Sequence, residues 1–316
     1  MPLDPALHRL IEDKLAHMRA RQWEMPIADV RKGFRDFWTP AITGQPPTPE
    51  RIEGLTIPGS AGGIRARLYA SRRDRRDPLL VFFHGGGYVK GGIDESDVFC
   101  RRLAIATRHA VVSVDYRLAP ENPFPAAVDD ALAAAAWVSS HANELGALSE
   151  PLVVSGESAG GNLAAVTCLR ARTDPGIAIR SQVLLQPVLD FTLSYASMAL
   201  SASDCLVPRD DLDWYYRTYY GGNDLKSPDV SPLFAPDVSG LPAALIVTAE
   251  FDTLRDEGAA YAERLKSAGV DVRYTCYAGM VHGFQQMAGL VPAAEAVVQE
   301  IATFLKRQSS SMRRSS

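Results

Sequence analysis

The sequence predicts an α/β fold, in which a mostly parallel central sheet is flanked by helices. Short and almost wholly apolar runs alternate along the chain with longer stretches of helical periodicity. This alternation is typical of buried parallel strands joined by helical crossovers. The chain has 316 residues, of which 47% are hydrophobic and 22% charged, so it can form a sizeable core without disulfides. These values exclude disordered, collagen-like and disulfide-scaffold proteins.

An N-terminal segment precedes this alternation. Apolar residues recur at helical spacing from Pro5 to about Arg21, which predicts an amphipathic helix. Residues 39–50 are rich in proline, as is typical of a linker. We therefore expect residues 1–45 to form a separate piece ahead of the main fold.

The main fold begins with an outer strand, in which Ile64, Ala66 and Leu68 point to one face. Further strands are predicted at Leu79–Phe83, Val111–Val114, Leu152–Val154, Val183–Leu185, Ala244–Val247 and Val272–Tyr277. Helices are predicted at about 125–140, 159–172, 256–268 and Ala293–Leu305. Residues 46–189 and 223–307 contain these elements and form the predicted core.

Two segments interrupt the alternation. Residues 190–222 separate two buried strands, are rich in aromatic side chains and have no strand pattern, so we predict a helical insertion above the sheet. Residues 308–316 consist mainly of serine and arginine. They have nothing to bury, which predicts a flexible tail.

The most specific motif is Gly156-Glu157-Ser158-Ala159-Gly160, which lies between a predicted strand and a predicted helix. A nucleophilic serine on such a tight turn has a strained backbone, and side chains two positions to either side would collide with the neighbouring strand and helix. The helix N-terminus also directs free N–H groups toward developing negative charge. Ser158 is therefore a candidate nucleophile.

A second motif, His84-Gly85-Gly86-Gly87-Tyr88, directly follows the apolar run Leu79–Phe83. Consecutive glycines allow backbone N–H groups to face a cavity, as in one half of an oxyanion hole. A phosphate-binding loop is the alternative, but Lys90 occupies the position where that pattern requires its third glycine. We expect His84 to brace this loop by hydrogen bonding.

A serine hydroxyl needs a base to remove its proton, and the base needs an orienting acid. In folds with this serine turn, the acid and then the histidine follow the serine in the chain. His282 is the only histidine after Ser158, and it follows a predicted strand at the sheet edge where ligands bind. Asp252, directly after another buried run, is the preferred acid, and Glu250 is the second candidate.

These motifs and three further segments resemble those of the hormone-sensitive-lipase-like carboxylesterases, known in bacteria as family IV. The further segments are Asp115-Tyr116-Arg117-Leu118-Ala119-Pro120-Glu121, Asp252-Thr253-Leu254-Arg255-Asp256-Glu257 and His282-Gly283-Phe284. The resemblance extends from about residue 50 to residue 305, with the motifs in family order. It implies an α/β-hydrolase fold of about eight strands with a helical cap, formed by residues 1–45 and the insertion 190–222.

The resemblance also implies roles for individual residues. Ser158 would be the nucleophile, His282 the base and Asp252 the acid. The oxyanion would be held by backbone N–H groups, namely those of Gly86, Gly87 and Ala159. The implied function is hydrolysis of short- to medium-chain carboxylic esters through an acyl-enzyme. Glu157 is a departure, because the family more often has aspartate at that position.

Aromatic residues of the two cap segments are candidates to line the substrate pocket, together with one residue of the glycine loop. They are Phe34, Phe37, Trp38, Trp214, Tyr215 and Tyr88. Packing of the cap against the core is the alternative for each of them. An amidase, a lactonase or an arylformamidase could use the same catalytic residues, and an inactive ligand-binding protein on this fold is the remaining alternative.

Composition restricts the partners. The chain has 33 Lys and Arg against 37 Asp and Glu, and it lacks the basic stripe of a nucleic-acid binder. No apolar run is long enough for a membrane span, no secretory signal is recognisable, and four widely spaced cysteines favour a reducing compartment. We expect a cytoplasmic enzyme acting on a small-molecule ester and water, with no cofactor or metal. Analogy with relatives suggests a homodimer.

Overall fold

The computed structural model describes residues 1–17, 20–71, 78–148, 150–174, 176–222 and 224–315. Its strands are β1 (Arg51–Gly59), β2 (Gly62–Ala70), β3 (Leu79–Phe83), β4 (Ala110–Val114), β5 (Leu152–Glu157), β6 (Ile179–Leu185), β7 (Ala243–Phe251) and β8 (Val272–Val281). Within the described residues, these eight strands form one sheet in the order β1-β2-β4-β3-β5-β6-β7-β8. β1 and β2 are antiparallel to their neighbours, and all the other pairs are parallel. The predicted α/β fold with a mostly parallel sheet is confirmed.

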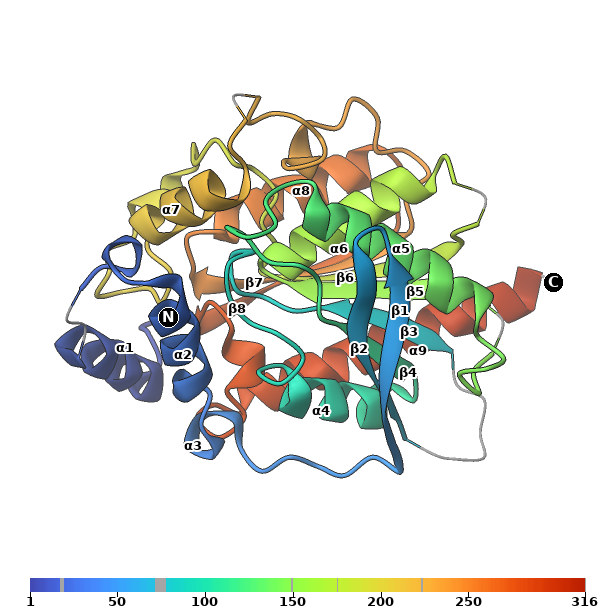
Figure 1. Cartoon of the computed structure of the whole chain (residues 1–316), viewed down its shortest axis with the longest axis horizontal. Coiled ribbons are helices and arrows are strands. Elements are labelled where there is room, and N and C mark those ends of the chain that lie inside the picture. Colours follow the sequence, from blue (N-terminus) through green and yellow to red (C-terminus); the bar gives the residue numbers. More distant parts are fainter. Residues whose placement is uncertain (18–19, 72–77, 149, 175, 223, 316) are drawn as a thin grey trace.

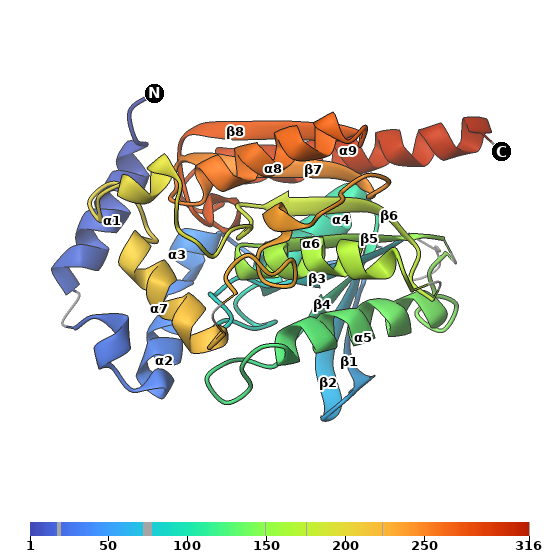
Figure 2. The same cartoon turned by 90° about the horizontal axis from the view of Figure 1, so that it is seen from above.

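Helices cover both faces of the sheet (Figure 1). One face carries α4 (Asp97–Thr107) and α9 (Ala293–Ser315), and the other carries α5 (Ala126–Ser140), α6 (Ala159–Ala171) and α8 (Arg255–Ser267). The remaining α-helices gather at one end of the sheet in both views (Figures 1 and 2). They are α1 (Pro5–His17), α2 (Ile27–Phe37), α3 (Pro40–Thr43) and α7 (Arg209–Tyr219). Four short 3-10 helices are also described, η1 (Gln22–Glu24), η2 (Ala196–Ala199), η3 (Pro232–Phe234) and η4 (Phe284–Gln286).

The core consists of two apolar clusters, one on each face of the sheet. In β3, Val81 and Phe83 belong to the cluster under α5, α6 and α8, whereas Leu80 and Phe82 belong to the cluster under α4 and α9. All five residues of β3 are buried. A strand buried on both faces must be apolar at every position, which is why its sequence shows a continuous run rather than alternation.

Several elements differ from the sequence prediction. β1 and α4 are absent from that prediction, and the first helix ends at His17, with residues 18–19 outside the described residues. The last helix continues past Leu305 to Ser315, so residues 308–315 extend a helix where a flexible tail was predicted. Extension of an existing helix adds one backbone bond per ordered residue, and Ser309 donates to the Leu305 carbonyl at 3.0 Å.

The insertion at residues 190–222 contains η2 and α7, in agreement with its predicted helical character. All four cysteines are free, and three of them are buried, whereas Cys276 on the edge strand β8 is exposed. No helix in the described part of the chain is long and apolar enough to cross a membrane.

Candidate active site

Ser158 lies on the turn between β5 and α6, with φ 58° and ψ −119°. Its N–H donates to the Leu185 carbonyl of β6 at 2.9 Å, which holds this strained backbone in place. A Cβ atom added to Gly156 would lie 2.0 Å from the Gly160 carbonyl oxygen, and one added to Gly160 would lie 2.0 Å from the Phe83 carbonyl oxygen. The predicted need for glycine at both positions is therefore met in the structure.

His282 and Asp252 meet at the carboxyl ends of β8 and β7. Nδ1 of His282 donates to the Asp252 carboxylate at 2.9 Å, and both side chains are buried, with exposed fractions of 9% and 0%. A second oxygen of Asp252 accepts from the Leu254 N–H at 3.0 Å. Burial of His282 opposes its protonation, but the charge of Asp252 and the hydrogen bond outweigh this effect, so the pKa of His282 is raised.

Glu250, the second candidate acid, has other partners. Its carboxylate accepts from the Gly279 N–H at 2.7 Å and forms an ion pair with the N-terminus at 3.0 Å. These interactions lower the pKa of Glu250. Asp252 is therefore the acid that the structure places against the histidine.

The approach of Ser158 to His282 follows from the strand order. β5, which delivers the serine, is separated from β7 only by β6, and β8 is the next strand beyond β7. The residue after the histidine, Gly283, donates to the Gln186 side chain at 3.3 Å, and a Cβ on Gly283 would lie 3.7 Å from the Glu157 carboxylate. Among the described residues no hydrogen bond joins Ser158 Oγ to His282, so the two side chains share the same sheet edge without a direct bond.

The glycine loop turns sharply beside this edge. Gly86 has φ 123°, and a Cβ atom there would lie 2.0 Å from the Lys90 carbonyl oxygen, so only glycine fits. His84 donates through Nδ1 to the Gly85 carbonyl at 2.8 Å and stacks on Tyr116, whose hydroxyl donates to the His84 carbonyl. These contacts agree with the bracing role predicted for His84.

Glu157, next to the serine, is a buried carboxylate between the two loops. Its Oε2 accepts from Gln286 Nε2 at 2.5 Å, and its Oε1 would lie 2.9 Å from a Cβ on Gly85. Burial raises the pKa of Glu157, and the neighbouring His282 and the hydrogen bond from Gln286 oppose that rise. The carboxylate thus touches both the glycine loop and the turn that carries the histidine.

Two of the six candidate pocket residues border the catalytic groups, and a third contacts one of them. A Cβ on Gly87 would lie 2.4 Å from the Tyr215 ring of α7, and one on Gly283 would lie 3.6 Å from the Trp38 ring. Phe34 meets Trp38 edge to face, with ring centroids 5.9 Å apart. These three rings come from the N-terminal segment and the insertion, and two of them, Tyr215 and Trp38, lie against the glycine loop and the histidine turn.

The other three candidates pack against aromatic neighbours. Phe37 and Trp214 pack against Trp38 and Tyr215, with ring centroids 4.9 and 5.1 Å apart. Tyr88 is fully buried and stacks on Tyr219 at 3.8 Å. For Tyr88 the packing alternative therefore agrees better with the structure.

Lys90 is a residue of this site that the sequence analysis did not assign. Its Nζ lies 4.9 Å from the centroid of Phe34 and 5.0 Å from that of Tyr215, and it donates to Gln22 Oε1 at 2.6 Å. The sequence feature that could have indicated this role is the charge of Lys90, three positions beyond Gly87 in an otherwise apolar stretch.

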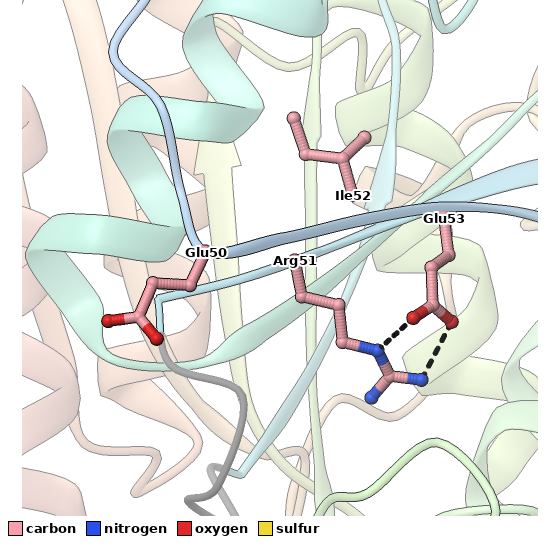
Figure 3. Close-up of a pocket in the computed structure, with 4 residues that line it drawn as sticks. All are labelled: Glu50, Arg51, Ile52 and Glu53. Atoms are coloured by element: carbon pink, nitrogen blue, oxygen red, sulfur yellow. Dashed lines mark hydrogen bonds and ion pairs between the residues drawn. The ribbon is translucent and has the colours of Figure 1, made fainter.

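A surface hollow of about 330 Å³ lies elsewhere, at the start of β1 (Figure 3). It is lined by Glu50, Arg51, Ile52 and Glu53, and Arg51 forms an ion pair with Glu53. Arg51 pairs with Ala70, which lies at the amino end of the parallel strands. Ser158 lies at their carboxyl end, so the hollow and the serine are at opposite ends of the strands. No group of three or more potential metal ligands occurs among the described residues.

A mostly parallel eight-stranded sheet that presents a serine on a strained turn, a histidine–aspartate pair and a glycine loop at one edge defines an α/β-hydrolase. Residues 80–286 match the family described as having the alpha/beta hydrolase fold, and the chain belongs to this family. The predicted resemblance to the hormone-sensitive-lipase-like carboxylesterases is confirmed by its relatives.

The chain is 43% identical over 264 residues to the carboxylic ester hydrolase LipN of Mycobacterium tuberculosis, which covers 81% of this chain and 70% of that protein. It is 36% identical over 275 residues to the ethyl acetate hydrolase of Pseudomonas putida, with coverage of 84% and 86%. The solved structure of the hyperthermophilic esterase from the archaeon Pyrobaculum calidifontis superposes with a TM-score of 0.92 at 40% identity. That superposition covers 98% of this chain and 99% of the esterase.

Proposed function

We propose that this chain is a serine carboxylesterase in which Ser158 is the nucleophile, His282 the base and Asp252 the orienting acid. The observation that supports these roles most strongly is the 2.9 Å hydrogen bond from His282 Nδ1 to Asp252, at the sheet edge that also holds the strained Ser158. Because Nδ1 keeps its proton in this bond, Nε2 is free to accept a proton from the serine.

The reaction proceeds in two halves. His282 takes the proton of Ser158 as the serine oxygen attacks the ester carbonyl, and the same imidazole then protonates the departing alcohol. The resulting acyl-enzyme is hydrolysed by a water that His282 deprotonates. In both halves the negative oxygen accepts hydrogen bonds from the backbone N–H groups of Gly86, Gly87 and Ala159, each contributing about 3 kcal/mol.

Residues 1–45 and 190–222 form a cap over this site in our proposal. Tyr215 on Gly87 and Trp38 on Gly283 support it, as does Arg31 of α2, which donates to the Val89 carbonyl at 2.8 Å. Such a cap of aromatic rings would enclose the bound substrate, which favours short- to medium-chain esters over long acyl chains. A cytoplasmic location and a homodimer stay predictions.

Replacement of Ser158 by alanine tests the proposal. With p-nitrophenyl butyrate as substrate, kcat is expected to fall by about a million-fold, because the nucleophile is removed. Ser155→Ala is a matched control, since Ser155 lies on β5, the strand that leads to Ser158, and is also buried. The wild type and this control are expected to react with a fluorophosphonate probe, and Ser158→Ala is not. Ester hydrolysis that survives in purified Ser158→Ala protein would contradict the assignment.

A further inference from the structure

Lys90 places a positive charge beneath the cap. Its ammonium lies between two aromatic rings, Phe34 of α2 and Tyr215 of α7, at 4.9 and 5.0 Å from their centroids. A cation over ring faces is attracted by their negative quadrupole, which is one way to hold a charge out of water. Its one hydrogen bond among the described residues goes to Gln22 Oε1 at 2.6 Å.

One of these rings borders the glycine loop, and the other contacts a ring that lies against the histidine turn. Tyr215 rests on Gly87 of the glycine loop, and Phe34 contacts Trp38, which in turn lies against Gly283. The ammonium of Lys90 therefore lies among the aromatic rings next to the site. Its charge also reaches His282, because it is among the influences that lower the pKa of that imidazole.

The charge of Lys90 is not compensated by a bonded carboxylate. No ion pair joins Lys90 to an acidic side chain among the described residues. Asp211 of α7 is the nearby acid, and its carboxylate accepts from Gln22 Nε2 at 2.8 Å while it also faces a second buried lysine, Lys14. Two lysines thus share one carboxylate at a distance. Burial lowers the pKa of Lys90 to about 7, with Asp211 only partly opposing that effect.

A cation that is already partly removed from water and lacks an anionic partner gains more from an incoming carboxylate than an exposed lysine does. We propose that Lys90 recognises a carboxylate carried by the substrate, so that the site favours esters with one negatively charged group over neutral esters of the same shape. This inference rests on the proposed esterase function. Lys90 makes no bond in the reaction itself and acts on specificity.

The test compares charged and neutral esters of equal shape. In the first arm the charge is on the acyl side, with monoethyl glutarate against the ethyl ester in which an isopropyl group replaces the carboxylate. In the second arm it is on the alcohol side, with p-acetoxybenzoate against p-isopropylphenyl acetate. The readout is the ratio of kcat/KM for the charged member to kcat/KM for the neutral member.

In at least one arm we expect the wild type to favour the charged ester. In that arm Lys90→Met is expected to lower the charged-to-neutral ratio of kcat/KM by about tenfold to a hundredfold, the effect of losing a charged hydrogen-bond partner. Lys226→Met is the matched control, because Lys226 also lies over a ring, that of Phe234, outside the site. Its ratio is expected to equal that of the wild type. Thermal melting shows whether each variant is folded.

The inference is overturned if the wild type favours the neutral ester in both arms, a result that needs no variant. It is also overturned if Lys90→Met leaves both ratios unchanged. In either case hydrolysis of the neutral esters, with its loss in Ser158→Ala, still supports the proposed function. Retained hydrolysis in Ser158→Ala contradicts the function and the inference together.

Discussion

Single residues of the site were predictable where the chemistry fixes their order and spacing. Ser158 follows from its flanking glycines, and His282 is the one histidine after it, so one sequence sufficed for both. The sequence favoured Asp252 over Glu250, and the structure agrees, because Asp252 follows β7 and meets the imidazole, whereas Glu250 lies within the strand. The position of Lys90 in the site could not be predicted, because its ammonium is held by Gln22, which lies 68 residues away in the chain.

Glu157 adds a second negative charge beside the imidazole. It is buried, it is held by Gln286, and it raises the pKa of His282 together with the larger contribution of Asp252. This carboxylate also touches the glycine loop at Gly85. Its position therefore links the protonation of the base to the packing of both loops.

This arrangement predicts the pH dependence of the reaction. Catalysis needs a neutral His282, so kcat/KM is expected to rise with pH, and because the pKa of His282 is raised, the rise lies above the ordinary value of about 6.5. Glu157→Gln removes one of the charges that favour the imidazolium, so the rise is expected to move to lower pH. The measurement is the pH profile of kcat/KM with a neutral ester.

Glu300→Gln is the control for that profile. Glu300 is also a buried acid, but it binds Arg273, Thr275 and Tyr277 at the far side of β8 from the site. Its replacement is expected to leave the profile in place. A profile of Glu157→Gln that coincides with that of the wild type would count against the electrostatic link.

At the scale of elements, the degree of burial determined which strands and helices could be predicted from the sequence. β3 to β7 contain apolar runs because parallel strands inside the sheet are covered on both faces. β1 has one fully buried side chain, Ile57, and contains Gly54 and Pro58, so it shows no such run. α4 buries Phe99 and Leu103, whose spacing of four is helical, but Arg101 and Arg102 interrupt the apolar pattern.

Two glycines in helices predict opposite responses to alanine. A Cβ on Gly160, at the start of α6, would meet the Phe83 carbonyl oxygen at 2.0 Å, whereas a Cβ on Gly33, inside α2, has no atom within 4 Å. Gly160→Ala is expected to lower the free energy of unfolding by about 3 kcal/mol, because backbone atoms cannot move aside as side chains do. Gly33→Ala is expected to raise it by about 1 kcal/mol, since alanine is the better helix former.

Urea unfolding followed by circular dichroism measures both changes. Gly33→Ala serves as the control that an added methyl group is not harmful in itself. Unchanged stability of Gly160→Ala would mean that the turn at Ser158 relaxes more easily than its contacts with β3 indicate.

At the scale of the whole molecule, helices α1 and α7 are attached to opposite layers of the core. Leu7 and Ile11 of α1 belong to the cluster under α4 and α9, whereas Tyr215 and Tyr219 of α7 belong to the cluster on the other face. Gln22 joins the two segments, because it donates to Asp211 and accepts from Tyr215. The sequence predicted both segments but not this division, which depends on long-range packing.

This attachment predicts that α1 unfolds together with the core. Leu7 is fully buried and Leu10, on the same helix, is only half-buried. Leu7→Ala is expected to lower the free energy of unfolding by about 3 kcal/mol, the usual cost of a cavity left by a buried leucine, within a single cooperative transition. Leu10→Ala, the matched control, is expected to cost about 1 kcal/mol, because less apolar surface is lost. Guanidinium unfolding followed by both fluorescence and circular dichroism measures these changes in the free energy of unfolding. A separate early transition, or an equal loss of stability in the two variants, would show that α1 is only loosely attached to the sheet.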